Sequence, residues 1–492
     1  MRPIARLLAR LLAFVALLGI AAQPAAAQSI LRDAETEALL LEMVNPLVEA
    51  AGMPKGSVEV VMVQDPSINA FVAGGQRIYV HSGLINAADN ANEVQGVLAH
   101  ELGHITGGHV ISGPQAAGNA MKIQLLSMLA GVAAMLAGAG DAGMAAMALG
   151  QQAAMGTYLS FSRTQEASAD AASVNFLRCA GISGRGAVNF FRKLQSLEFR
   201  HGYSQSDEAG FARTHPLTGD RISRLEADLK NDPAWGGPPV GPADLVAEFE
   251  APPASPGDET RPHAELGSNC TDVPVPTADL ERRFQLAKAK LYGYLATPAQ
   301  TLRSYPTHMT GAPARYARAY AYNKDVLLDE AQAEADALIA GEPDNPYFLE
   351  LKGQMLLESG KPLEALEPLR RATTLTGNNP LIASLFAHAL LATEDDSRLA
   401  EAEQVLKGAV GRDRENPGAW YQLGIVYGAR GDIPRAQLAS AEQQIMTGRP
   451  REALQNAESA ERGLEQGTPD WLRAGDVALQ ARAELERTRD RN

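Results

Sequence analysis

The sequence has few aromatic residues, little positive charge and no succession of long hydrophobic runs. Aromatic residues make up 5% of the 492 residues and hydrophobic residues 45%, so the core must be aliphatic and rich in alanine, a composition that favours helices. The net charge of −14 argues against a nucleic-acid partner, because phosphate binding requires a basic face. The lack of several long apolar spans argues against a membrane-embedded protein.

Cysteine is also scarce, since Cys179 and Cys270 are the two cysteines of the chain. In an oxidising compartment they can form one disulfide bond. The alternative is that Cys179, which follows the apolar residues Phe176 and Leu177, is a buried free thiol. Both alternatives remain open at this point.

The first residues have the pattern of an export signal. Three arginines within the first ten residues precede the apolar run Leu11–Ala22, and small residues follow it up to Ala27. We expect a signal peptide at residues 1–27, cleaved after Ala27, and export to a bacterial periplasm. The alternative is an uncleaved membrane anchor, although the apolar run is short for a span of about 20 residues.

A five-residue motif in the first half of the chain, His100-Glu101-Leu102-Gly103-His104, has the spacing of a zinc site. Residues four apart lie on one face of a helix, so His100 and His104 can bind one metal ion, with Glu101 beside the attacking water. Asn90 and Glu93 match a capping box at the start of such a helix. Because so short a pattern also arises by chance, a third ligand is needed to support the site.

We expect that third ligand to be Glu166, on a second helix predicted at residues 161–180. A catalytic zinc ion has three protein ligands and one open position. Asp170 lies one helical turn after Glu166 and could accept a hydrogen bond from the second nitrogen of a ligating histidine. The alternative is that Glu166 and Asp170 form a solvent-exposed acidic face.

Two strands are predicted before the zinc helix, at residues 57–63 and 77–81. A strand directly before that helix can be an exposed edge that pairs with an extended substrate through main-chain hydrogen bonds. The alternative is a two-stranded ribbon that only covers the helix.

An uncharged stretch follows, rich in alanine, glycine and methionine, at residues 123–140 and again at 144–155. We interpret it as a pair of small-residue helices or as an apolar lip over the site. Contact with a membrane surface and a true membrane span are the alternatives.

The remaining chain divides into a linker and a repeated region. Prolines and glycines predict a linker at residues 232–279. Beyond it, Asn345-Pro346, Asn379-Pro380 and Asn416-Pro417 begin similar units 34 and 37 residues apart. This period is typical of tetratricopeptide repeats, which stack into a solenoid that binds protein segments. A plain helical bundle is the alternative for residues 280–492.

Several further motifs accompany the zinc motif between residues 30 and 230. They are Asn69-Ala70-Phe71, Gly74-Gly75, Ile78-Tyr79-Val80, His109, Ser162-Arg163, Glu166 with Ala169-Asp170, and Thr214-His215-Pro216 with Arg221. Together they resemble the family of zinc metallopeptidases that includes CaaX prenyl endopeptidase and HtpX. The soluble BepA-like branch, which joins this domain to tetratricopeptide repeats, is the most similar.

The resemblance implies a mainly α protein. An α+β zincin-type metallopeptidase domain with a small β-sheet would occupy residues 28–231, followed after the linker by an all-α tetratricopeptide-repeat solenoid. It implies one Zn²⁺ per chain, held by His100, His104 and Glu166, with Glu101 as the catalytic base.

The resemblance also implies a role in envelope quality control, with unfolded or misassembled envelope proteins as substrates and the outer-membrane assembly machinery as a partner of the repeats. The competing hypothesis is a chaperone-like adaptor whose metal site is silent or secondary.

Two residues near the end of the first domain have roles that stay open. His215, held before Pro216, could take the fourth position at zinc and keep the enzyme inactive until a client moves its loop, or it could cap a helix or contact substrate. Arg221 and His215 are candidates to stabilise the transition state. We interpret His109, at the glycine-rich end of the zinc helix, as structural.

Overall fold

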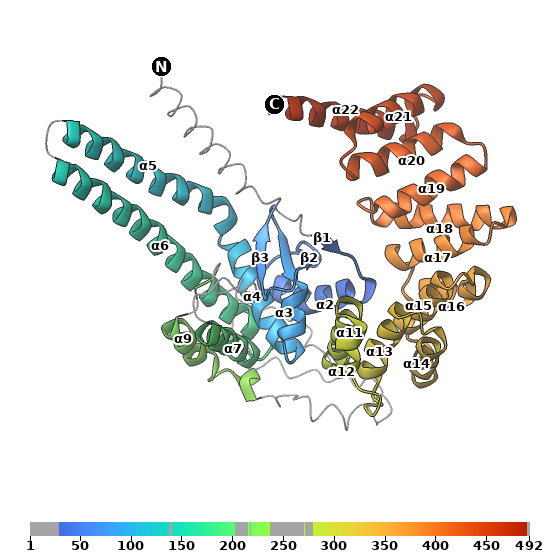
Figure 1. The fold of residues 1–492 in the computed structure, drawn as a ribbon, viewed down its shortest axis with the longest axis horizontal. Coiled ribbons are helices and arrows are strands. Elements are labelled where there is room, and N and C mark those ends of the chain that lie inside the picture. Colours follow the sequence, from blue (N-terminus) through green and yellow to red (C-terminus); the bar gives the residue numbers. More distant parts are fainter. Residues whose placement is uncertain are drawn as a thin grey trace, which may run out of the picture.

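A computed structural model describes residues 29–136, 140–201, 215–216, 218–236, 270 and 279–489. The fold is mainly α, with one small sheet near the start and a long series of helices after it, as predicted (Figure 1). The predicted signal peptide and most of the predicted linker lie outside the described residues.

The sheet has four strands in the order β1-β2-β4-β3. They are β1 (Ser29–Leu31), β2 (Glu59–Gln64), β3 (Ala70–Ala73) and β4 (Arg77–His81). β4 pairs with β2 in parallel and with β3 antiparallel, with Val72 opposite Ile78. The strand at residues 77–81 is therefore central in a four-stranded sheet, so both alternatives, an exposed edge and a two-stranded ribbon, were wrong for it. The turn at Gly74 and Gly75, with φ of +64° and +103°, folds β3 back outside β4 and makes β3 the edge.

The first part of the chain also forms a set of helices. They are α2 (Ala34–Ala50), α3 (Ser82–Ala87), α4 (Ala91–Thr106), α5 (His109–Leu136), α6 (Gly140–Cys179), α7 (Arg185–His201), α9 (Gly219–Leu229) and the 3-10 helix η2 (Pro233–Gly236).

The helix α4 lies at the centre of the first core. Its residues Val97 and Leu98 are buried in one cluster with Met43 of α2 and Phe190 of α7. Two glycines let the neighbouring helices approach α4 closely. A Cβ on Gly96 would lie 2.5 Å from Ala187 of α7, and one on Gly103 would lie 2.6 Å from the carbonyl oxygen of Ala169 of α6.

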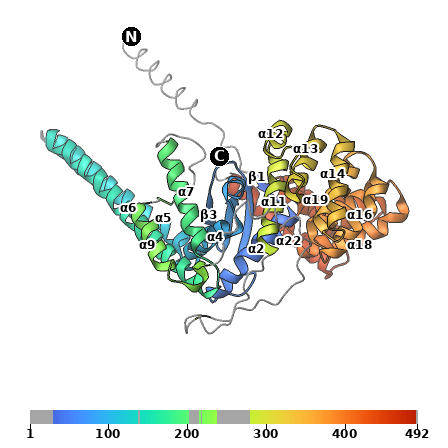
Figure 2. The same ribbon diagram turned by 90° about the horizontal axis from the view of Figure 1, so that it is seen from below.

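The helices α5 and α6 form a long hairpin that projects from the body of the protein (Figures 1 and 2). The uncharged stretch forms the outer part of this hairpin, so the prediction of paired small-residue helices is confirmed. Within the described residues, no helix is long and apolar enough to cross a membrane.

The C-terminal helices follow one another in a curved row (Figure 1). They are α11 (Asp279–Leu295), α12 (Pro298–Ser304), α13 (Ala312–Lys324), α14 (Leu328–Gly341), α15 (Pro346–Glu358), α16 (Pro362–Leu375), α17 (Pro380–Ala392), η4 (Asp396–Arg398), α18 (Leu399–Arg412), α19 (Pro417–Ala429), α20 (Ile433–Met446), α21 (Pro450–Gly463) and α22 (Pro469–Arg489).

The repeated Asn-Pro pairs begin alternate helices of this row. Asn345, Asn379 and Asn416 each accept a hydrogen bond from a backbone N–H in the first turn of α15, α17 and α19, and each is followed by proline at the first helical position. The repeat predicted from the sequence is therefore a helical hairpin with a fixed start, and the plain bundle is excluded.

The two parts of the protein share a core. Phe284 of α11 is buried in the same cluster as α2 and α4, whereas Leu286 of that helix packs into the next cluster with Tyr316 of α13. A buried ion pair adds to the junction, because Lys290 Nζ of α11 lies 2.5 Å from Asp33 Oδ2. The helix α11 therefore connects the two parts, and the division at residue 280 stays a prediction.

The two cysteines form a disulfide bond, Cys179–Cys270. It attaches residue 270 to the last residue of α6. The alternative of a free buried thiol at Cys179 is thereby excluded.

Candidate metal centre

The helix α4 presents both histidines of the motif to the interior. Asn90 caps the helix by accepting a hydrogen bond from Glu93 N, as predicted. The Glu93 side chain accepts from Asp89 N instead of Asn90 N, so the predicted capping box forms only in part. His100 is 0% exposed and His104 is 8% exposed. Their Nε2 atoms lie 3.1 Å apart, so both rings point at one place between them.

The helix α6 brings Glu166 to the same place. Its Oε2 lies 3.3 Å from His100 Nε2, and its Oε1 lies 3.5 Å from His104 Nε2. This approach depends on the close packing of Gly103 against Ala169, three residues after Glu166. Glu166 is 4% exposed, so the alternative of a solvent-exposed acidic face does not describe it.

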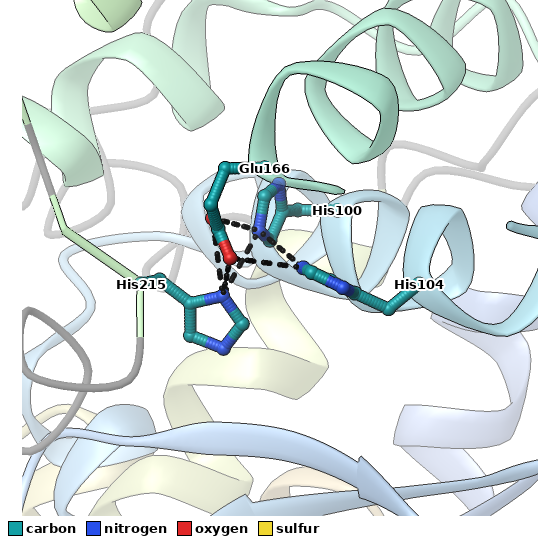
Figure 3. Close-up of side chains that lie close together, drawn as sticks. All are labelled: His100, His104, Glu166 and His215. Atoms are coloured by element: carbon teal, nitrogen blue, oxygen red, sulfur yellow. Dashed lines mark hydrogen bonds and ion pairs between the residues drawn. The ribbon is translucent and has the colours of Figure 1, made fainter. Parts of the chain in front are cut away.

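His215 completes the cluster from the opposite side (Figure 3). Its Nδ1 lies 3.0 Å from Glu166 Oε1 and 3.3 Å from His100 Nε2. His215 is 6% exposed and is therefore buried in the site. Thr214, which precedes it in the predicted motif, lies outside the described residues.

The donor atoms of these four residues suit a zinc ion. One donor atom from each of His100, His104, Glu166 and His215 lies within 4.8 Å of all the others. Imidazole nitrogen and carboxylate oxygen are preferred zinc ligands. Burial, reinforced by the neighbouring His100 and His215, lowers the pKa of His104 to about 2, so this ring is neutral, which is the form that binds a metal.

A second set of contacts holds the ligands in place. Asp170 Oδ1 lies 3.0 Å from His100 Nδ1, the nitrogen that points away from the cluster. Arg221 donates hydrogen bonds to both carboxylate oxygens of Asp170 at 2.8 Å. Burial opposes the charge of Asp170, but the bonds with Arg221 and His100 outweigh it and lower its pKa to about 2. Asp170 is thus an ionised acceptor that orients His100.

Arg221 also contacts the other side of the site. Its Nη1 lies 2.9 Å from Glu166 Oε2 and donates to the carbonyl oxygen of Pro216 at 2.9 Å. The guanidinium therefore ties α6 to the segment that carries His215. Because Arg221 contacts Asp170, Glu166 and the carbonyl oxygen of Pro216, the geometry favours a positioning role over the transition-state role considered from the sequence.

Glu101 lies beside the cluster with its charge poorly satisfied. It is 0% exposed, and neither carboxyl oxygen accepts a hydrogen bond from the part of the chain that the structure describes. His215 Nε2 lies 3.4 Å from Oε1. Burial raises the pKa of Glu101 above its usual value, a property expected of a general base that must also release a proton. An orphaned carboxylate next to four metal donors fits a site built around a metal and water.

One contact of the site was missed in the sequence. His109 Nδ1 lies 2.9 Å from His104 Nδ1, so the ring returns onto the metal helix. The turn at Gly107 and Gly108 makes this possible, since Gly108 has φ of +63° and a Cβ on Gly107 would lie 2.4 Å from His109 Nε2. The spacing of five residues, with two glycines between, was the available signal.

The site opens into a cavity of about 210 Å³. Glu101, His104 and Glu166 form its polar wall, and Phe71 and Val72 of the edge strand β3 form part of its apolar wall. An edge strand beside a metal cluster offers unpaired main-chain groups to an extended peptide.

The fold and the donor set define a zincin-type metallopeptidase. Residues 33–229 match Peptidase family M48, so the chain carries a metallopeptidase domain of this family, whose members use zinc. The predicted resemblance to this class of enzymes and the predicted cofactor are thereby confirmed.

Comparison with individual proteins extends the similarity beyond this domain. The chain is 24% identical over 441 residues to the beta-barrel assembly-enhancing protease of Escherichia coli (strain K12), which covers 87% of this chain and 80% of that protein. It is 33% identical over 174 residues to Metalloprotease LoiP of the same organism, which covers 35% of this chain and 63% of LoiP. The solved structure of YrrB, a TPR protein with an unusual peptide-binding site, matches 36% of this chain and 91% of that chain at 20% identity, with a TM-score of 0.30.

Proposed function

We propose that this metallopeptidase is a zinc-dependent endopeptidase of the bacterial periplasm that acts on misfolded or stalled envelope and outer-membrane proteins. The observation that carries the proposal is the buried cluster of His100, His104 and Glu166 with the orphaned carboxylate of Glu101 beside it. The similarity to an enzyme named for β-barrel assembly, along 87% of the chain, supports the envelope as the place of action.

The residues of the cluster have separate roles in this proposal. His100, His104 and Glu166 would hold the zinc ion, and Asp170 would orient His100. When bound, zinc supplies a Lewis acid that polarises the peptide carbonyl and activates water. Glu101 takes the proton of the attacking water and passes it to the leaving amine, and its raised pKa suits both steps. Arg221 holds the two carboxylates on α6 in position and favours the ionised form of Asp170.

The substrate would lie along β3. Main-chain pairing with this edge strand recognises an extended backbone and tolerates many side chains. Phe71 and Val72 line the cavity that contains Glu101, so a peptide on β3 passes the catalytic carboxylate. Such a cleft accepts unfolded segments and excludes folded proteins, which is the selectivity that quality control requires.

His215 would restrain this activity. Its Nδ1 lies among the metal donors, so it would occupy the fourth position that a water or a substrate carbonyl needs. The loop must move before peptide can be cleaved. This arrangement would keep a periplasmic protease inactive in the absence of a client.

The helical repeats would recruit clients or the outer-membrane assembly machinery. Solenoids of this type bind protein segments on their concave face. We assign residues 28–231 to the peptidase domain, 232–279 to a proline-rich linker and 280–492 to the solenoid. A signal peptide cleaved after Ala27 would deliver the chain to the periplasm, where the Cys179–Cys270 disulfide is stable.

Digestion of casein tests the proposal against the adaptor hypothesis. We expect the purified chain to cleave casein, a metal chelator to abolish cleavage, and added zinc to restore it. A chaperone-like adaptor would instead suppress the aggregation of an unfolded outer-membrane protein equally well with and without the chelator, and would leave casein intact.

A further inference from the structure

The outer part of the α5–α6 hairpin exposes large apolar side chains on both helices. We define the outer hairpin as residues 121–136 of α5 and 144–159 of α6. The exposed fraction is 67% for Leu126 and 66% for Leu149. The others, all between 41% and 70% exposed, are Met121, Leu125, Met128, Leu129, Met144, Met155 and Leu159. So many large apolar side chains in one protrusion indicate a surface that is covered by something else.

The contact between the two helices is made by small residues. A Cβ added to Gly150 would lie 1.9 Å from the side chain of Ser127, so the backbones are too close for a larger residue at position 150. Ala154, one turn further on, is 4% exposed. A hairpin that is stable in water buries its large apolar residues between its helices. Here the large residues lie outside and the small ones inside, which is the arrangement of helix pairs in lipid.

The scarcity of charge on the outer hairpin also indicates a lipid partner. Between Lys122 and Arg163, Asp141 is the one charged residue of the sequence, whereas 21% of the whole chain is charged. Lys122, near the base of the outer hairpin, is its one basic residue. One basic residue gives little attraction to anionic headgroups, so the partner is bound chiefly through apolar contact. The hairpin also projects away from the body of the protein, so its tip can reach a surface that the rest of the protein does not touch (Figure 2).

We propose that the outer hairpin inserts into one leaflet of a lipid bilayer and docks the enzyme on a membrane surface. From Met121 to Leu136 the helix α5 rises about 22 Å, at 1.5 Å per residue. One leaflet contributes about half of the 30 Å hydrocarbon core, so the hairpin is long enough to enter a leaflet.

The position of the hairpin gives this attachment a consequence for the active site. The helix α5 begins at His109, which contacts His104, and α6 carries Glu166. Val110 and Phe161, at the base of the two helices, line the catalytic cavity. Docking would therefore hold the cavity close to the lipid surface, where unassembled membrane proteins are found. This consequence depends on the proposed peptidase function, whereas the binding itself does not.

Flotation with vesicles tests the proposal. The chain beginning at Gln28 is used, so that the apolar N-terminal segment cannot account for binding. With neutral phosphatidylcholine vesicles, the wild-type chain should float with the lipid, and high salt should not release it. The double variant Leu126→Glu/Leu149→Glu should bind roughly a hundredfold more weakly, because charges replace two leucines that the bilayer would bury. The variant Glu101→Gln should bind like the wild type, which separates docking from catalysis.

A matched control is available on the solenoid. Leu363 and Leu479 are each 63% exposed, so Leu363→Glu/Leu479→Glu changes the same chemistry at the same exposure and should leave binding unchanged. Equal binding by the hairpin variant and the wild type would overturn the proposal. A second result would also overturn it: the wild-type chain does not bind vesicles but forms dimers, and the substitutions Leu126→Glu/Leu149→Glu dissociate these dimers. A second copy of the chain would then cover the hairpin. Thermal unfolding of both variants shows that they fold.

Discussion

The Nδ1 atoms of His104 and His109 lie 2.9 Å apart. If His104 uses Nε2 for the metal, its Nδ1–H donates to His109, which then takes the place of the carboxylate or carbonyl that usually orients a ligating histidine. Replacing His109 with Leu should weaken zinc binding by roughly tenfold to a hundredfold. His109→Gln, whose amide oxygen can accept the same hydrogen bond, should recover most of the affinity. Competition with a chromogenic chelator measures both, and an unchanged affinity in the Leu variant would refute the role.

Arg221 should be essential to the stability of the site as well as to zinc binding. Its guanidinium is the cation that neutralises Asp170 and Glu166, both buried. Removing one partner of a buried ion pair costs about 3 kcal/mol. Arg221→Met should lose that much in urea unfolding measured with chelator present. Arg192→Met, which removes the exposed pair with Glu226, should lose about 1 kcal/mol at most. Equal losses would contradict the positioning role.

His215→Ala should raise the basal rate of casein cleavage. The imidazole would no longer compete for the metal, and peptide would enter without a client moving the loop. His308→Ala, which changes an exposed histidine of the solenoid part, should leave the rate unchanged. A lower rate in the His215 variant would instead assign this residue to catalysis or to the structure of the site.

The junction between the two parts should become less stable as the pH rises. Burial raises the pKa of Glu35 and of Glu350 from 4.5 to about 7, and Asp33 reinforces the shift although Lys290 opposes it. Between pH 4.5 and 7 the folded chain keeps protons that the unfolded chain releases, so the free energy of unfolding falls as pH rises through this window. In Glu350→Gln, the decrease in the free energy of unfolding over this pH window should be smaller than in the wild type by about 2 kcal/mol.

Urea unfolding at pH 5 and pH 8 measures this difference. Glu364→Gln, on the exposed side of α16, is the control and should follow the wild type. Parallel profiles for all three proteins would show that these carboxyls do not titrate with folding.

The sequence was sufficient where local spacing determines the geometry. The spacing of four positions from His100 to His104 places both rings on one face of α4, and the same spacing places Asp170 behind Glu166. The Asn-Pro pairs likewise determine the start of each repeat, because the asparagine caps the helix and the proline has the right φ.

Contacts that depend on tertiary packing could not be predicted. The sheet order that makes β3 the edge follows from the hairpin at Gly74 and Gly75, and the sequence contains no signal that distinguishes it from β4 as an edge. The return of His109 onto His104 requires the left-handed turn at Gly108. The outward position of Leu126 and Leu149 could not be predicted from the sequence, because the apolar residues of α5 and α6 do not gather on one face.

The zinc content of three purified chains tests the central claim most directly. After gel filtration, metal analysis of the wild type and of Glu101→Gln should give one zinc per chain, with casein cleavage lost by about a hundredfold or more in Glu101→Gln. Glu166→Ala should be depleted of zinc. Full zinc occupancy in Glu166→Ala, or a wild-type chain that binds no zinc, would contradict the assignment of this cluster as the catalytic metal site.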